Sequence, residues 1–294
     1  MTMRERFYTL AADALESDPR VAMVFAEIGV AQMPKHPRMF NVGIREQLMI
    51  SVAAGLALEG YRAVAHSYTP FVVERPYEQI KLDLGHQDVG AILVSTGASY
   101  DASHAGRTHQ APEDVAVLAA LPGWTIEVPG HPDEIERAFA RALAEDDRVY
   151  IRLSEEENHA PVRGEGLVIL REGSATAPFV IAVGPTLGET LVATAELDAT
   201  VAYLTTVRPF PREALGTALR GTDVVLVEPY LAGTSAAAVA AALADRPHRL
   251  LSIGVANVEL RRYGTGSDHR AAHGLDAEGI RRSFTGLLSP VPAA

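Results

Sequence analysis

The fold-deciding stretch begins Asn41-Val42-Gly43-Ile44-Arg45-Glu46-Gln47 and continues as Leu48-Met49-Ile50-Ser51-Val52-Ala53-Ala54-Gly55-Leu56-Ala57-Leu58. Gly43 predicts a tight turn, and the run after Gln47 predicts a helix that is apolar or small throughout, and so buried on most sides. Glu46 shares its helical face with Ile50, Ala53 and Ala57. A carboxylate on such a face loses its hydration, which is costly unless it bonds to another group. Glu46 is therefore a candidate functional residue, although a carboxylate that only stabilises the helix N-terminus would look the same.

The composition excludes several classes of function. The chain has 294 residues, of which 48% are apolar and 21% charged, so it can form two ordinary globular domains. Its net charge of −11 argues against binding to nucleic acid or to an anionic membrane surface. It has no cysteine, which excludes disulfides and thiolate chemistry. The first residues predict an amphipathic helix rather than a signal peptide, and no apolar run reaches the roughly 18 residues of a membrane span, so we expect a cytoplasmic protein.

Short apolar runs alternate with helical patterns along the whole chain, which is typical of α/β domains with largely parallel sheets. We expect strands at 21–28, 62–67, 90–95, 125–128, 149–153, 179–183, 200–204, 223–228 and 250–254. We expect helices at 44–58, 71–84, 112–121, 131–144, 190–197, 232–244 and 276–287. The acidic, proline-containing stretch 154–166 interrupts this pattern and predicts a linker. The predicted fold is therefore α/β with two doubly wound domains, at 1–160 and 161–294.

Polar and aromatic residues near the predicted strand ends are further candidates. His109 ends a long loop of small residues that also holds His104 and Arg107, a combination suited to anion binding and proton transfer. A solvated loop histidine is the simpler alternative. Tyr68 and Phe71 follow a strand end, where ligands bind in open α/β sheets, although such aromatic pairs more often belong to a core. Arg75 can point to the same place or into solvent. Phosphate-binding glycine loops, nucleophile elbows and His/Glu metal spacings are absent, so we expect no metal site on this chain.

Taken together, these segments resemble the pyrimidine-binding half of transketolases in sequence, order and spacing. The resemblance rests on Phe40-Asn41-Val42-Gly43-Ile44-Arg45-Glu46-Gln47, Ala53-Ala54-Gly55-Leu56-Ala57, Ser67-Tyr68-Thr69-Pro70-Phe71, Arg75 with Tyr77-Glu78-Gln79-Ile80, and Gly106-Arg107-Thr108-His109-Gln110. More weakly, Val207-Arg208-Pro209 and Val227-Glu228-Pro229 with Gly233 resemble the transketolase C-terminal domain. The resemblance implies a pyrimidine-binding thiamine-diphosphate-type domain at 1–160 and a transketolase C-terminal-like domain at 161–294.

The resemblance also implies a cofactor and a partner. The family binds thiamine diphosphate between a pyrimidine-binding domain and a pyrophosphate-binding domain, and the latter holds diphosphate and Mg²⁺ with a Gly-Asp-Gly motif. This chain lacks that motif, so it resembles the C-terminal-half subunit of a split transketolase. We expect a separate pyrophosphate-binding, N-terminal-half subunit to hold most of the Mg²⁺ coordination. The expected assembly is an α2β2 heterotetramer with this chain self-associating at its core.

By the same resemblance, each candidate residue acquires a role. Glu46 would hydrogen-bond the cofactor's aminopyrimidine ring and so activate it, making it a catalytic residue. Gly43, Tyr68, Phe71 and Arg75 would join Glu46 in cofactor binding, with the two aromatic rings enclosing the pyrimidine. His109 would face substrate hydroxyls or the oxyanion as a second catalytic residue. A substrate-binding set is also expected, comprising His104, Arg107 and His109.

Two positions depart from the family pattern. Ala105-Gly106 stands where transketolases usually have Asp-Gly, an aspartate that reads a donor hydroxyl. Glu155 lies near where sugar-phosphate enzymes of the family carry a phosphate-binding arginine, and a carboxylate there repels a phosphate dianion. These departures predict an unusual, unphosphorylated donor or acceptor, as in secondary metabolism, unless Arg107 restores an anion site.

Other readings remain open. A beta subunit of a 2-oxo acid dehydrogenase has the same architecture and the same glutamate, although Thr108-His109-Gln110 favours transketolase. A carboligase similar to 1-deoxyxylulose-phosphate synthase is another, but that family normally keeps both halves in one chain. A non-catalytic scaffold or regulatory subunit is an alternative of a different class. Against it stands the retention of Glu46 and the aromatic pair, which a degenerate site need not keep.

Overall fold

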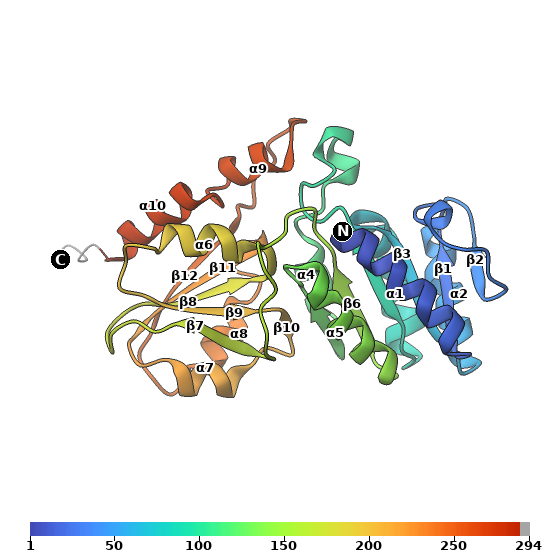
Figure 1. The fold of residues 1–294 in the computed structure, drawn as a ribbon, viewed down its shortest axis with the longest axis horizontal. Helices are drawn as coiled ribbons and strands as arrows, with labels where there is room; N and C mark the ends of the chain where they lie inside the picture. The colour runs from blue at the N-terminus through green and yellow to red at the C-terminus, as the bar shows by residue number, and fades with distance from the viewer. Residues whose placement is uncertain (289–294) are drawn as a thin grey trace.

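The computed structural model describes residues 1–288 as two layered α/β units side by side (Figure 1). The strands of the first sheet are β1 (Val21–Phe25), β2 (Met39–Asn41), β3 (Arg62–Tyr68), β4 (Ile92–Thr96), β5 (Trp124–Glu127), β6 (Arg148–Arg152) and β10 (Thr206–Arg208). They lie in the order β10-β5-β6-β4-β3-β1-β2, and every neighbouring pair is parallel except β10 with β5. Buried parallel strands need helices on both faces, as the alternating sequence pattern predicted.

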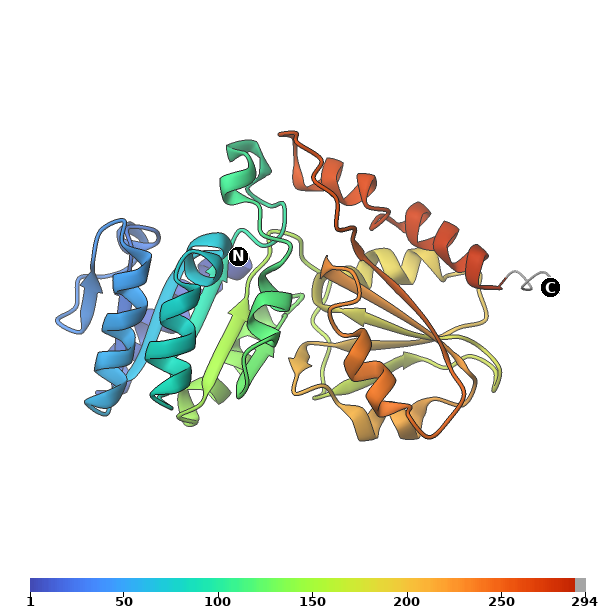
Figure 2. The same cartoon turned by 180° about the vertical axis from the view of Figure 1, so that it is seen from behind.

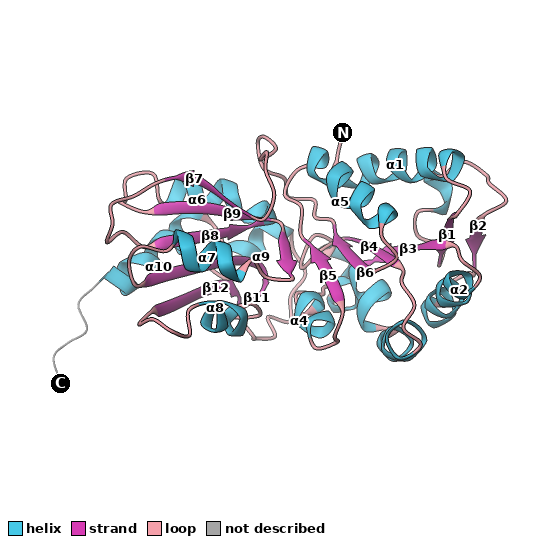
Figure 3. Cartoon of the chain, turned by 90° about the horizontal axis from the view of Figure 1, so that it is seen from below, coloured by secondary structure: helices cyan, strands magenta, loops and turns pink. Residues whose placement is uncertain are grey.

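Helices cover both faces of the first sheet (Figure 3). One face carries α1 (Met3–Ser17) and α5 (Pro132–Ala144). The other carries α2 (Glu46–Leu58), a helical segment over 70–86 that includes α3 (Tyr77–Gln79), and α4 (Asp114–Ala119). Pro132 in the first turn of α5 and the Thr2–Glu5 capping box of α1 set the starts of these two helices.

The second sheet contains β7 (Leu167–Arg171), β8 (Phe179–Val183), β9 (Thr200–Leu204), β11 (Asp223–Leu231) and β12 (Arg249–Val255). Its order is β12-β11-β8-β9-β7, with β7 antiparallel to β9 and the other pairs parallel. One face packs against α6 (Leu187–Ala193) and α10 (Ala277–Leu288), and the other against α7 (Arg212–Ala218) and α8 (Ala236–Ala242). Figure 2 shows the molecule from behind, with α8 in front of the second sheet. Helix α9 (Gly266–Ala272) lies on the side of this unit that is nearer to the first sheet. The predicted α/β fold class is confirmed.

The predicted domain boundary at residue 160 falls in the segment between β6 and β7. One strand crosses it, because β10 pairs with the edge strand β5 of the first sheet. The apolar core is continuous across the same junction, where Ile126 and Val128 cluster with Val207 and Phe210. The division into two domains at 160/161 therefore stays a prediction, because strand β10 and a continuous apolar core connect the two units.

Two details differ from the sequence-based expectations. The predicted regular helix 71–84 is a wider, partly π-helical run over 70–86, in which Arg75 N–H donates to Pro70 O at 3.0 Å. Pro76 contributes to this irregularity, because it has no N–H to donate. In α2, Met49 and Ile50 are buried, but Leu48 is 44% and Leu58 is 57% exposed. The expectation that α2 is buried on most sides is thus wrong for the single chain, since only one face of the helix meets the sheet.

His66 of β3 packs against the buried side of α1. In β3, Nδ1 of His66 lies 2.9 Å from Val94 O and its Nε2 lies 3.1 Å from the Tyr8 hydroxyl. Burial lowers the pKa of His66 from 6.5 to about 3, outweighing the opposing effect of the Val94 carbonyl. The imidazole is therefore neutral in the folded protein at neutral pH.

The free energy of unfolding should fall as the pH drops from 6.5 towards 3, because the unfolded chain then binds a proton that folded His66 does not. Stability from this group is fully present above 6.5, and about 2 kcal/mol of it is lost between about pH 7 and pH 5. Urea unfolding of the wild type and of His66→Gln at both pH values measures this. The variant starts less stable but should lose about 2 kcal/mol less over the interval. Equal losses in both proteins would contradict the assignment.

Within residues 1–288, no helix is both long and apolar enough to cross a membrane.

Candidate active site

Glu46 lies at the first position of α2, next to the carboxyl end of the first sheet, and is only 2% exposed. Its Oε1 accepts a hydrogen bond of 2.7 Å from Nη1 of Arg75, whose side chain is 39% exposed. No residue within the described 1–288 hydrogen-bonds its Oε2. The chain thus places a desolvated carboxylate with one oxygen held and the other available to a ligand.

Aromatic rings stand beside this carboxylate. The guanidinium of Arg75 lies 4.0 Å from the ring centroid of Phe71, so the cation links Glu46 to the aromatic wall. Phe71 packs edge-on against Tyr68 at 6.1 Å and against His109 at 5.0 Å. Tyr68 and His109 are 5.7 Å apart, which closes the cluster. Five residues selected from the sequence, namely Glu46, Tyr68, Phe71, Arg75 and His109, are therefore neighbours in space.

His109 reaches this cluster from a short 3₁₀ turn over Arg107–His109. Burial lowers the pKa of His109 below 6.5, and the positive charges of Arg75 and His104 add to this effect. A neutral imidazole presents one N–H donor and one acceptor nitrogen. His109 can therefore donate to a hydroxyl or oxyanion without carrying a net charge.

Two glycines shape the backbone around the cluster. Gly43 has a φ of +71°, and its N–H donates to the side chain of Asn41 at 3.1 Å, which forms the turn before α2. Gly97 has a φ of +72°, and a Cβ there would lie 2.6 Å from the ring of Tyr68. The Tyr68 ring thus rests directly on the Gly97 backbone, a requirement that the sequence analysis missed. The signal was the Thr96-Gly97 pair directly after a strand.

The remaining predicted substrate residues are arranged differently. His104 lies exposed on the turn Ser103–Ala105. Arg107 pairs with Glu113 at 2.8 Å and with Glu259 at 3.0 Å. Its guanidinium therefore already has two carboxylate partners, and a direct role in binding substrate stays a prediction for both residues.

Arg4 is a cation at the site that the sequence analysis missed. Its guanidinium lies 5.6 Å from the ring centroids of both Tyr68 and Tyr8, and its Nε donates to the Tyr8 hydroxyl at 2.8 Å. Helix α1 therefore brings a positive charge to the edge of the aromatic cluster. The sequence carried no local sign of this, because 64 positions separate Arg4 from Tyr68.

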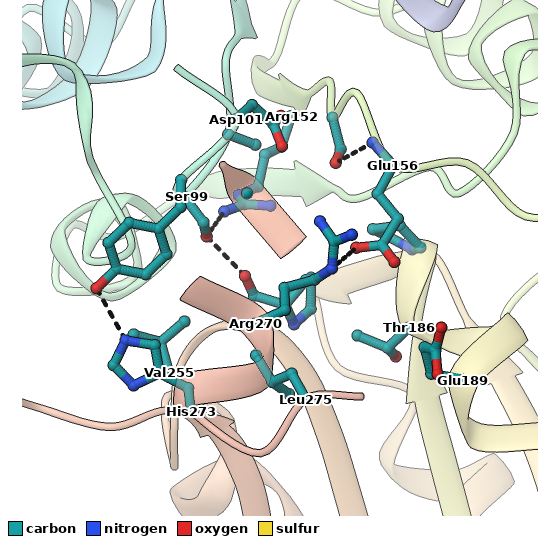
Figure 4. Close-up of a pocket in the computed structure, with 16 residues that line it drawn as sticks. Ser99, Asp101, Arg152, Glu156, Thr186, Glu189, Val255, Arg270, His273 and Leu275 are labelled. Atoms are coloured by element: carbon teal, nitrogen blue, oxygen red, sulfur yellow. Dashed lines mark hydrogen bonds and ion pairs between the residues drawn. The ribbon is translucent and has the colours of Figure 1, made fainter. Parts of the chain in front are cut away.

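A separate small cavity lies where the two sheets meet (Figure 4). Its volume of about 30 Å³ has room for about two water molecules, not for a sugar. Arg152 of β6 and Asp101 line one side, and Glu156 pairs with Arg270 of α9 at 2.9 Å on the other. Burial raises the pKa of Asp101 to about 7, despite the opposing hydrogen bond from the Glu155 N–H. The cavity is part of the contact between the sheets and is distinct from the Glu46 cluster.

No group of three or more acidic or histidine side chains within residues 1–288 is placed to hold a metal ion. The donors that the Glu46 cluster offers are one carboxylate, one imidazole and several aromatic faces. Such a set suits a planar, nitrogen-containing ring better than a metal.

Comparison with known proteins identifies the family of this chain. Residues 1–159 match the family model described as the transketolase, pyrimidine binding domain. The chain belongs to the transketolase family. The predicted resemblance is confirmed, and membership of this family implies thiamine diphosphate as the cofactor.

Three relatives of this transketolase-family chain are informative. It is 48% identical to an uncharacterized 33.6 kDa protein in the fasciation locus of Rhodococcoides fascians, and the match covers 96% of this chain and 93% of that protein. It is 31% identical, over 77% of its length, to 75% of the 6-deoxy-6-sulfo-D-fructose transketolase subunit SqwH of Clostridium sp. strain MSTE9. It is 30% identical, over 95% of its length, to 94% of an apulose-4-phosphate transketolase subunit of Actinobacillus succinogenes. Relatives that are transketolase subunits support a two-component transketolase-type function.

A solved structure shares the fold. A split-gene transketolase, described as an inactive beta4 tetramer, superimposes with a TM-score of 0.83 and 23% identity over 98% of each chain. The predicted α/β architecture with two doubly wound domains is thus shared with a solved structure described as a split-gene transketolase.

Proposed function

We propose that this chain is the pyrimidine-binding subunit of a cytoplasmic, two-component, thiamine-diphosphate-dependent transketolase. It would transfer a two-carbon ketol unit from a ketose donor to an aldehyde acceptor. The observation that carries the proposal is the buried Glu46 carboxylate, whose Oε1 is held by Arg75 while its Oε2 has no hydrogen-bond partner among residues 1–288. The same Arg75 stacks on Phe71 of the aromatic cluster. The names of its relatives support the reaction class, while donor and acceptor are inferred only as classes.

The residues present fit the pyrimidine ring of the cofactor. Tyr68 and Phe71 offer aromatic faces, and Gly43 allows the backbone to approach closely. Oε2 of Glu46 would share a proton with a ring nitrogen, in a pocket where low polarity strengthens the bond. When bound, thiamine diphosphate supplies the nucleophilic carbon that carries the two-carbon unit. We assign Mg²⁺ and the diphosphate to the partner subunit, because the family holds them on the pyrophosphate-binding domain.

His109 would act on the substrate. Its ring packs against both Tyr68 and Phe71, so it faces the space beside the pyrimidine site. As a neutral imidazole, it would donate a hydrogen bond to a substrate hydroxyl and to the developing oxyanion. Arg75 would orient Glu46, since it holds one carboxylate oxygen while stacking on Phe71.

Exposed apolar side chains on α2 and the turn before it support the expected partner. Ile44 in the turn before α2 is 74% exposed, and Leu48 and Leu58 on the helix are 44% and 57% exposed. Apolar side chains gathered next to a site typically mark a protein interface. We propose that the pyrophosphate-binding subunit covers this face, within an α2β2 heterotetramer whose core is formed by copies of this chain.

Reconstitution tests the proposal. This chain, its pyrophosphate-binding partner, Mg²⁺ and thiamine diphosphate should together form ketol-transfer products, while neither subunit alone should be active. Leu48→Glu should abolish co-elution of the subunits, because it places a charge in the interface core. The matched control, Leu191→Glu on the exposed side of α6, should assemble normally.

Several outcomes would contradict the proposal. Tight cofactor binding and turnover by this chain alone would remove the need for a partner. Decarboxylation of a 2-oxo acid with acyl transfer to a lipoyl group would instead indicate a dehydrogenase beta subunit. Assembly that is unaffected by Leu48→Glu would place the partner on another surface.

A further inference from the structure

A cleft of about 390 Å³ lies between the loop that carries His109 and the segment 256–265 of the C-terminal half. Its walls include Arg107, Gln110, Glu259, Arg261, Arg262 and Tyr263. Figures 1 and 2 both show these two segments side by side at the top of the molecule, above the junction of the sheets. Gly106 and Gln110, which flank the His109 turn, also line the cleft, so one short turn separates it from the aromatic cluster.

Specific hydrogen bonds hold the segment 256–265 against the His109 loop. The Ser103 hydroxyl donates to Gly264 O at 2.6 Å, and the Gln110 amide donates to Arg262 O at 3.3 Å. Arg107 adds the ion pair with Glu259 at 3.0 Å. These contacts therefore fix the positions of Arg261 and Arg262 relative to the His109 loop.

Uncompensated positive charge remains in this cleft. Arg107 is balanced by Glu113 and Glu259, as described above. Arg262 donates to a backbone carbonyl, Asp268 O at 2.7 Å, and forms no ion pair among residues 1–288. The hydrogen bond from the Thr265 N–H lowers the pKa of the nearby Asp268 carboxyl, and the charge of Arg262 adds to this effect. Arg261 is exposed and has no hydrogen-bond or ion-pair partner among residues 1–288. Two adjacent guanidinium groups that form no ion pair within the described residues are unexpected on a chain with a net charge of −11.

The backbone conformation of Arg261 also indicates a functional role for this residue. Its φ is +51°, in the left-handed region that favours glycine or asparagine, so an arginine there is disfavoured locally. Strained positions of this kind cluster at functional sites, where the side chain itself is required. Next to it, Tyr263 is 69% exposed and rests against Gly106, where a Cβ would lie 2.9 Å from its ring.

We propose that Arg261 and Arg262 form an oxyanion-binding subsite for the far end of the substrate, a phosphate or sulfonate group. This inference rests on the proposed function, because it assigns the cleft to the substrate that reacts beside His109. Planar guanidinium groups bind such tetrahedral anions through paired N–H donors. Arg107 belongs to the wall of the subsite and is restrained by its two glutamates.

The first experiment needs neither partner nor turnover. Inorganic phosphate is titrated into the isolated full-length chain at low salt and followed by ³¹P line broadening. Arg261→Gln/Arg262→Gln should weaken phosphate binding by about tenfold or more, because two charge-assisted donors are removed. Arg282→Gln, an exposed arginine on α10, is the matched control and should bind as the wild type does. Glu259→Gln should increase the affinity for phosphate, since Glu259 is the only acidic residue among the described residues that line the cleft.

The second experiment distinguishes a substrate group from a free anion. In the reconstituted enzyme, the double arginine variant should raise KM for a phosphorylated or sulfonated ketose by about tenfold. KM for the unphosphorylated ketose should not change, and phosphate should compete only with the anionic substrate. Unchanged phosphate affinity in the isolated variant would overturn the subsite, whatever the enzyme's activity. Weaker phosphate binding with an unchanged KM for the anionic ketose would overturn its assignment to the substrate.

Discussion

Replacing Glu46 by glutamine is expected to lower kcat of the reconstituted enzyme by about a hundred- to ten-thousand-fold, the usual contribution of a positioned acid or base. Glutamine keeps the size of the side chain and still accepts the hydrogen bond from Arg75. It cannot exchange a proton with the pyrimidine ring, so only the proton-transfer role is removed. The loss should fall on kcat, with little change in the amount of cofactor bound.

Stability measurements separate this effect from misfolding. Arg75 is 39% exposed, so its charge stays hydrated when Glu46 becomes neutral, and the free energy of unfolding should change by less than about 1 kcal/mol. Glu16→Gln, which neutralises an exposed acid on α1, should leave both activity and stability unchanged. Full activity of Glu46→Gln, with partner and cofactor supplied, would show that Glu46 has no catalytic role.

The largest expected effect on stability comes from Arg152, whose side chain is 1% exposed. Its Nε donates to Asp114 at 2.8 Å, its Nη2 donates to the Ser99 hydroxyl at 2.6 Å, and Asp114 is itself fully buried. Arg152→Met leaves the Asp114 carboxylate without a cation in the interior. We expect a loss of about 3–5 kcal/mol in the free energy of unfolding, measured by urea denaturation.

Two further variants show whether the uncompensated charge is the cause. Arg152→Met/Asp114→Asn removes both charges and should recover much of the lost stability, because a neutral amide is cheaper to bury than an unpaired carboxylate. Arg249→Met breaks an exposed pair with Asp223 and should cost less than about 1 kcal/mol. A double variant as unstable as Arg152→Met would instead assign the loss to packing against Tyr230, which lies 5.5 Å from the guanidinium.

The sequence predicted the core of the fold because its signals are local. Residues 179–183 and 200–204 were expected as strands and are strands with those bounds, since short apolar runs between turn residues have few other solutions. Strands β2, β7 and β10 were not predicted. Ile169 and Leu170 of β7 are about 40% exposed, and β2 and β10 have only three residues each, so none of them shows the buried pattern on which such predictions depend.

The candidate site was predictable in part for the same reason. Glu46, Tyr68, Phe71, Arg75 and His109 belong to short motifs whose order and spacing carried the resemblance, and the structure brings them together. Arg4, Arg261 and Arg262 reach the site or its surroundings only through tertiary contacts, and no local pattern marks them. Arg107 lies in a recognisable motif, but its partner Glu259 is 152 positions away, so the ion pair between them could not be predicted from the sequence.

The antiparallel strand β10 has a consequence for the newly made chain on the ribosome. Thr206 pairs with Glu127 of β5, and 79 positions separate them in the sequence. At about 5–20 residues per second, β5 would wait roughly 4–16 s as an open sheet edge before its neighbour is synthesised. Unpaired edges invite association with other chains. The nascent N-terminal half is therefore most vulnerable to mispairing in this interval, and translation through residue 208 ends it.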